Sequence, residues 1–136
     1  MQFVVDSNII ISAIISFDGK TRELLFSDKF LFFAPEFLLA EIKKHEKEIL
    51  KKSGLNKSEF ELALSLVSSR IIFVSFVEFK KFISKAEQVC PDENDVEFFA
   101  LALSKNIPLW SNYKKLKNQP KVKVVSIKEL IQDYYL

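Results

Sequence analysis

Carboxylates occur at widely separated places in the sequence, beside segments that could bring them to one edge of a sheet. Asp6 directly follows a short apolar run, and Asp92 and Asp95 precede a long one. In open parallel sheets, ligands collect in the crevice beyond the carboxyl ends of the strands. Glu41 is a further candidate, because its immediate neighbours are apolar and a solvated acid is less expected there. These acids could therefore share one site.

Acids that share a partly buried crevice have a predictable chemistry. Their charges repel one another and raise each carboxyl pKa unless a cation neutralises them. Hard oxygen ligands favour Mg²⁺ or Mn²⁺ over zinc. A magnesium ion that is held by a few acids and keeps some of its waters is a common device for hydrolysing phosphodiesters.

Each acid also has a purely structural interpretation. Asp6 could cap the helix that follows it. Asp95 could stabilise the first turn of a helix through the helix dipole. Glu41 could be a partly exposed helix acid paired with Lys44 or His45. Asp92 could be a solvated first-turn acid. A helix-capping or dipole role does not exclude metal binding by the same side chain.

The elements that must position these acids alternate between strands and helices. Apolar runs that are rich in β-branched and aromatic residues predict strands at 2–5, 29–35, 70–76, 107–111 and 122–126. Strands separated by helices imply right-handed crossovers and a mostly parallel sheet covered on both faces. Ser111 and Asn112 end the fourth strand, so they should reach the same edge as Asp6.

The helix signals are local. One long amphipathic helix is predicted over 35–54, with Pro35 in its first turn and Gly54 at its end. Capping boxes are predicted at Asn56/Glu59, Asn94/Glu97 and Ser126/Glu129. Aromatic residues expected in the core are Phe73, Phe76, Phe98, Phe99 and Trp110.

Length and composition limit the class of protein. A chain of 136 residues with 49% hydrophobic content suits one globular domain spanning 1–136. The net charge of +2 permits a nucleic-acid partner without arguing strongly for one. The single cysteine, Cys90, excludes an internal disulfide and a thiolate zinc cluster. Asp6 and Asn8 interrupt the apolar amino-terminal stretch, so we expect a soluble, cytoplasmic protein without a membrane segment.

Three segments resemble, in order, the successive acidic motifs of the PIN-domain family. They are FVVDSNIIISA, APEFLLAEI and PDENDVEFFALALSKNIPLWSNYKKL, and the resemblance covers essentially the whole chain. PIN domains are metal-dependent ribonucleases and are often the toxin half of bacterial and archaeal toxin–antitoxin pairs. The resemblance implies a three-layer α/β/α sandwich around a parallel sheet.

The resemblance also implies roles for individual residues. Matched by position, the metal-binding acids would be Asp6, Glu41 and Asp95. The supporting residues would be Asn8 and Ser111, with Asn112 beside them at the strand end. Lys114, Lys115 and Lys117 follow the site and could hold RNA phosphates, although a plain surface turn is the alternative.

The chain departs from the family at the fourth acid. The family pattern is Ser or Thr, one residue, Asp and often Lys, whereas this chain has Tyr113 at the Asp position. A phenol is neutral at pH 7, so the site loses one formal negative charge. Asp92 could lean into the gap, since it lies one helical turn before Asp95. Otherwise the chain keeps the groove and cleaves poorly.

The expected activity is Mg²⁺- or Mn²⁺-dependent endoribonuclease cleavage, weakened by Tyr113, with RNA as substrate. An antitoxin partner and a homodimer are further expectations from the resemblance. The alternative is a catalytically silent module that binds RNA or a protein through the same groove.

The fourth position gives a first prediction. Tyr113→Asp should raise Mn²⁺-dependent cleavage of single-stranded RNA, because it restores a strong oxygen ligand. Turnover of labelled RNA by the variant and the wild type measures the effect. Unchanged turnover would show that this position does not limit activity.

Overall fold

The computed structural model describes residues 1–16 and 19–135, which form a parallel sheet covered by helices. The strands that it contains are β1 (Gln2–Val5), β2 (Leu31–Pro35), β3 (Ile71–Val74), β4 (Leu109–Trp110) and β5 (Val124–Val125). Their order is β3-β2-β1-β4-β5, and every neighbouring pair is parallel.

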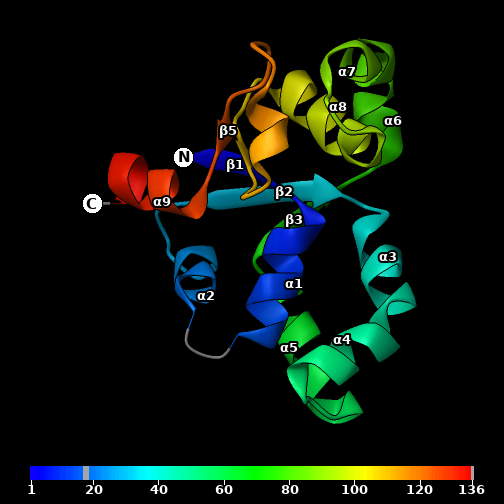
Figure 1. Ribbon diagram of the computed structural model, residues 1–136, viewed down its shortest axis with the longest axis vertical. Coiled ribbons are helices and arrows are strands. Elements are labelled where there is room, and N and C mark those ends of the chain that lie inside the picture. The colour runs from blue at the N-terminus through cyan, green and yellow to red at the C-terminus, as the bar shows by residue number, and fades with distance from the viewer. Residues whose placement is uncertain (17–18, 136) are drawn as a thin grey trace.

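Helices cover both faces of this sheet. The α-helices are α1 (Ser7–Ile15), α2 (Lys20–Leu25), α3 (Leu38–Lys44), α4 (Glu46–Ser53), α5 (Lys57–Ser68), α6 (Phe76–Phe79), α7 (Ile83–Val89), α8 (Val96–Lys105) and α9 (Ile127–Leu130). Short 3₁₀ or π turns are η1 (Lys80–Phe82), η2 (Glu93–Asp95), η3 (Lys114–Lys117) and η4 (Ile131–Tyr135). Helices α6, α7 and α8 lie on one side of the sheet, and α1 and α5 lie on the other (Figure 1). The predicted three-layer α/β/α architecture is confirmed.

The strand order places a topological switch beside β1. The chain runs from β1 outward through β2 and β3, and then returns to add β4 and β5 on the other side of β1. Val5 is in register with Trp110, and the Asp6 amide donates to the Trp110 carbonyl at 3.3 Å. The residues after β1 and β4 therefore leave the sheet side by side, where open α/β sheets form their ligand crevices.

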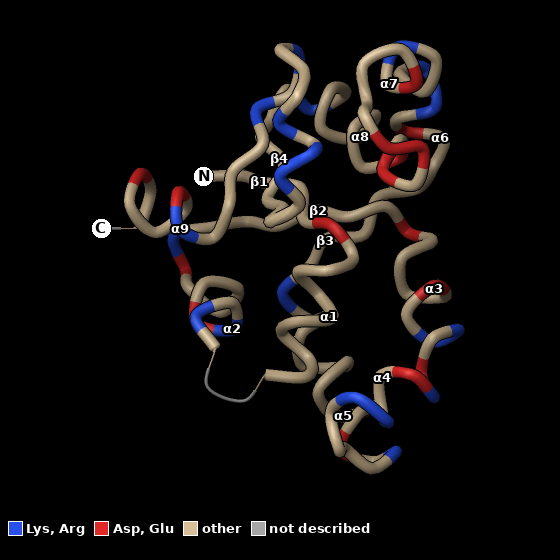
Figure 2. The backbone as a smooth tube through the Cα atoms, in the orientation of Figure 1, with Lys and Arg blue, Asp and Glu red and all other residues tan. Residues whose placement is uncertain are grey.

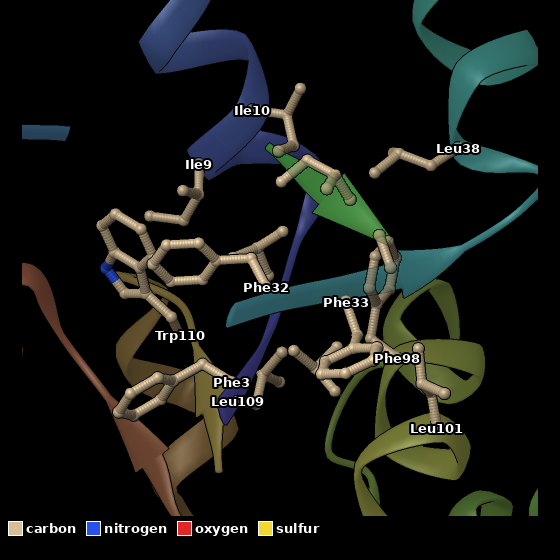
Figure 3. Close-up of a cluster of buried hydrophobic side chains, with 14 of the residues drawn as sticks. Phe3, Ile9, Ile10, Phe32, Phe33, Leu38, Phe98, Leu101, Leu109 and Trp110 are labelled. Carbon is tan, nitrogen blue, oxygen red and sulfur yellow. The ribbon is translucent and has the colours of Figure 1, made fainter. Parts of the chain in front are cut away.

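Aromatic and aliphatic side chains from both helical layers fill the core (Figure 3). Trp110 is fully buried, and its ring centroid lies 5.4 Å from that of Phe32. Its indole N–H is buried without a hydrogen-bond partner among the described residues. Phe98 and Phe99 are buried as predicted, whereas Phe76 is 44% exposed, so its assignment to the core was wrong.

The helix predicted over 35–54 begins later than predicted and is interrupted once. Pro35 is the last residue of β2 and is in register with Val74, so it stays in the sheet instead of starting a helix. His45, with φ −98° and ψ 15°, separates α3 from α4. After this interruption α4 packs against α1. Gly54 ends α4 as predicted.

Two of the three predicted capping boxes are present, at Asn56/Glu59 and Ser126/Glu129. The box at Asn94 and Glu97 is wrong. The 3₁₀ turn η2 precedes α8, and the Asp92 side chain caps it by accepting from the Asn94 amide at 2.9 Å. Helix α8 therefore begins only at Val96.

The remaining predicted elements are shorter than expected. Of the strand predicted over 122–126, only Val124 and Val125 pair, as β5. The closing helix is α-helical up to Leu130 and continues as the π turn η4. Leu136 at its end lies outside the described residues. None of the described helices is long and apolar enough to cross a membrane.

The left-handed residue that ends α4 gives a stability prediction. Gly54 has φ +74°, and a Cβ there would meet no atom within 4 Å. Gly54→Ala should therefore lower the free energy of unfolding by about 1 kcal/mol through backbone strain alone. Gly54→Asn should lose less, because Asn tolerates this conformation better. Urea unfolding compares them, and equal losses in the two variants would contradict the explanation.

Candidate metal centre

Asp6 is the most deeply buried acid of the described chain, at 2% exposure. It follows β1 and caps α1, because its Oδ1 accepts from the Ile9 amide at 3.0 Å. The capping interpretation from the sequence is therefore present in the structure. It leaves the second carboxylate oxygen for other partners, so capping and cation binding remain compatible.

Ser111 supports Asp6 from the neighbouring strand. It is buried, and its hydroxyl is hydrogen-bonded to the Asp6 carboxylate. Burial raises the pKa of Asp6, while this hydroxyl and the backbone amides of Ile9 and Asn8 oppose the rise. Asn8 itself is exposed, and the supporting role of its side chain stays a prediction.

Asp95 ends the 3₁₀ turn η2 directly before α8, and Asp92 caps the start of that turn. Burial is the largest cause that raises the pKa of Asp95 to about 6, and the charges of Asp6 and then Asp92 add to it. Two carboxylates, one of them from a distant segment of the chain, therefore act on Asp95. Figure 2 shows acidic positions where α8 begins.

Glu41 stands apart from these three acids. Its side chain on α3 is about half exposed, and its Oε1 lies 3.7 Å from His45 Nε2. The other ring nitrogen of His45 lies 3.5 Å from Glu48. The predicted pairing with His45 is thus observed. Glu41 also lines a groove of about 330 Å³ that Asn8 shares, so the groove reaches the residue two positions after Asp6.

The donor set suits a hard divalent cation in chemistry. The acids offer only oxygen ligands, which Mg²⁺ and Mn²⁺ prefer, and like charges in a buried crevice favour a cation between them. As they stand, no three His, Cys, Asp or Glu side chains within 1–16 and 19–135 are close enough to hold a metal ion.

Asn112 and the lysines lie at the end of β4. The Asn112 side chain accepts from the Ile127 amide at 2.8 Å, which ties this loop to α9. Lys114, Lys115 and Lys117 are all exposed on η3, and Lys117 pairs with Glu129. Figure 2 shows the lysine positions along the chain beside β4. All three predicted RNA-binding lysines are thus exposed, and Lys117 among them forms an ion pair.

The sequence did not reveal one direct contact in this region. The Tyr113 hydroxyl donates to Asp92 Oδ2 at 3.3 Å. The two residues are 21 positions apart, and only the suggestion that Asp92 could fill the gap left by the fourth acid pointed toward the contact. The tyrosine at an expected acid position is the sequence signal that points to this contact.

Comparisons with known proteins agree with this architecture. A family model described as the PIN domain matches residues 4–128. The chain is also similar to a chain in the crystal structure of VapBC2 from Rickettsia felis bound to a DNA fragment from their promoter. The TM-score is 0.67 and the identity 21%, over 93% of this chain and 98% of that chain. This likeness shows the fold. No curated protein matches the sequence.

The raised pKa of Asp95 gives a prediction for stability. The folded-state pKa of about 6 lies above the ordinary value of 3.8. The protonated side chain is therefore favoured in the fold, and the stability that this provides is lost as pH rises from about 4 through 6. In metal-free buffer at pH 8, Asp95→Asn should raise the free energy of unfolding by about 2 kcal/mol, with allowance for partial exposure.

Urea unfolding from pH 3.5 to 8 measures this effect. The gain should disappear at the acid end of the range, where Asp95 is protonated in both states. Glu93→Gln is the matched control, because it removes an exposed acid in the same turn. A gain from Asp95→Asn that is the same at every pH would contradict the electrostatic origin.

Proposed function

Because this chain belongs to the PIN-domain family, we propose that it is a Mg²⁺- or Mn²⁺-dependent endoribonuclease. The observation that carries the proposal is the buried Asp6 carboxylate at the β1–β4 switch, which acts electrostatically on Asp95. A buried acid beside a second, half-buried acid is costly unless a cation joins them. Stability alone gives no reason to keep this arrangement.

The protein's own residues have distinct tasks in this proposal. When bound, a divalent cation lowers the pKa of a water ligand and offsets the charge of the phosphodiester. Asp6 anchors the site, because the Ile9 amide and the Ser111 hydroxyl hold its carboxylate. Asp95 and Asp92 complete the acid set from the start of α8. Glu41 orients the attacking water or adds a ligand, which requires it to turn away from His45.

The RNA backbone would follow the exposed lysines next to the site. Lys114 and Lys115 come directly after Tyr113 and lie free of the ion pair that engages Lys117. Phosphate contacts of this kind make binding weaken as salt rises. Lys117 should contribute less, because binding RNA would break its pair with Glu129.

A protein partner is a further part of the proposal. The similar solved structure is of VapBC2 bound to promoter DNA, and the PIN family includes many toxins. We therefore propose that this chain works as a toxin with an antitoxin protein that covers its groove. Homodimer formation and a cytoplasmic location stay predictions from the sequence.

A silent binding module is the second candidate. Two observations favour it. Among the described residues, no three His, Cys, Asp or Glu side chains are close enough together to hold a metal ion. Tyr113 also occupies the fourth acid position. Such a module would keep RNA or a protein in the groove and leave phosphodiesters intact.

Titration with Mn²⁺ while following thermal unfolding, together with cleavage of labelled single-stranded RNA, tests the proposal. Wild-type protein should gain stability by mass action, about 2.7 kcal/mol at a Mn²⁺ concentration of 100 times Kd. Asp95→Asn should abolish both this gain and cleavage. Glu93→Gln should leave both intact. RNA retention without any Mn²⁺ response would favour the silent module and reject the nuclease.

A further inference from the structure

Tyr113 replaces the fourth acid of the family with a side chain that donates a hydrogen bond. Its hydroxyl lies 3.3 Å from Asp92 Oδ2. Its backbone amide donates to Ser111 Oγ at 3.1 Å, so the main chain that carries the ring is fixed at the site. The side chain is 40% exposed. Filling the core is therefore not its role.

Hydrogen bonds and one charge interaction connect the acids at the ends of β1 and β4. The Ser111 hydroxyl is bonded to Asp6 and also accepts from Tyr113. The Tyr113 phenol reaches Asp92, whose charge acts on Asp95. Tyr113, at the position that lacks an acid, is thus connected to Asp6 through Ser111 and to Asp92 through its own hydroxyl.

Asp92 is held at both of its carboxylate oxygens. Oδ1 accepts from the Asn94 amide at 2.9 Å, and Oδ2 accepts from the phenol. The Cys90 thiol also donates to the Asp92 main-chain carbonyl at 3.1 Å. Each carboxylate oxygen has two lone pairs, so one hydrogen bond to each leaves capacity for a cation. Asp92 is therefore oriented without being blocked.

We propose that Tyr113 is a positioning residue that holds Asp92 in the place of the missing fourth acid. Asp92 supplies the negative charge and the oxygen ligand, and Tyr113 supplies the direction in which that carboxylate points. The inference rests on the proposed divalent-cation function and assigns a role to a residue that would otherwise only weaken the site.

The expected size of the effect follows from hydrogen bonds to metal-binding carboxylates. Removing such a bond typically costs 10–100-fold in metal affinity. The Tyr113–Asp92 distance is longer than the usual value of about 2.7 Å for a hydroxyl donor. We therefore expect the lower end of that range, about tenfold.

Tyr113→Phe isolates the hydroxyl, because the ring and its contacts stay. Tyr113→Asp is a different change, since it brings a carboxylate of its own. The chain also offers a matched control: the Tyr135 hydroxyl donates to a Glu23 carboxylate oxygen at the same distance, 3.3 Å. Tyr135→Phe removes a similar bond near the carboxyl end of the described chain, away from the acids of the β1–β4 crevice.

The experiment is a double-mutant cycle on Mn²⁺ affinity, measured by calorimetry and by the electron paramagnetic resonance signal of free Mn²⁺. Tyr113→Phe should weaken binding about tenfold, and Asp92→Asn, which removes a ligand, should weaken it at least as much. The double variant should bind no more weakly than Asp92→Asn alone, because the hydroxyl acts only through Asp92. Tyr135→Phe should bind as the wild type does.

A spectroscopic readout separates positioning from a general structural effect. With ¹³C-labelled tyrosine rings, Mn²⁺ should broaden the Tyr113 resonance in the wild type and leave the Tyr135 resonance sharp. Thermal unfolding of Tyr113→Phe without metal should match the wild type. Loss of Mn²⁺ affinity that only accompanies a loss of fold would overturn the positioning role.

The outcomes distinguish this inference from the proposed function beneath it. If Tyr113→Phe binds Mn²⁺ unchanged while Asp95→Asn abolishes binding, the positioning role is wrong and the metal site stands. Tighter Mn²⁺ binding by Tyr113→Phe also overturns the positioning role, since the phenol would then be keeping the Asp92 carboxylate away from the cation. If neither Asp95→Asn nor Asp92→Asn changes Mn²⁺ affinity, the metal site itself fails and the inference fails with it.

Discussion

The burial of one negative charge at the end of β1 constrains the rest of the molecule. Asp6 has almost no contact with solvent, and moving an ionised carboxylate out of water is costly unless it is paired and hydrogen-bonded. Two backbone amides and the Ser111 hydroxyl offset part of that cost. The strand order makes this possible, because β4 lies directly beside β1 and delivers Ser111 to the same edge. The charge of Asp6 in turn contributes to the raised pKa of Asp95, which lies in η2 before α8.

Much of the architecture could be predicted from hydrophobic patterning. Alternating apolar strands and amphipathic helices lead to a parallel sheet with two helical layers, because few other arrangements bury both faces of such strands. The failures occurred where tertiary pairing outweighs local preference. Pro35 suits a first helical turn, yet pairing with β3 retains it in β2. Asn94 and Glu97 have capping-box spacing, but the Asp92 side chain caps a turn that starts earlier.

The candidate site was predictable to the extent that strand ends determine it. Asp6 and Ser111 end neighbouring parallel strands, so their proximity follows once the strand order is known. Asp6 also raises the pKa of Asp95, as expected if the first and third acidic motifs of the sequence lie near each other. The contact between Tyr113 and Asp92 depends on how two loops fold against each other, and no periodic pattern encodes that. Glu41 shows the same limit, because its neighbour His45 competes for its carboxylate.

The position of Trp110 has a practical consequence. It is the sole tryptophan of the chain, it is fully buried, and it lies one residue before Ser111 on the strand that borders the acidic crevice. Indole emission is sensitive to the polarity and quenchers around the ring. The tryptophan fluorescence of the native protein therefore originates one residue before Ser111, and a ligand that shifts the end of β4 should change this emission without any attached dye.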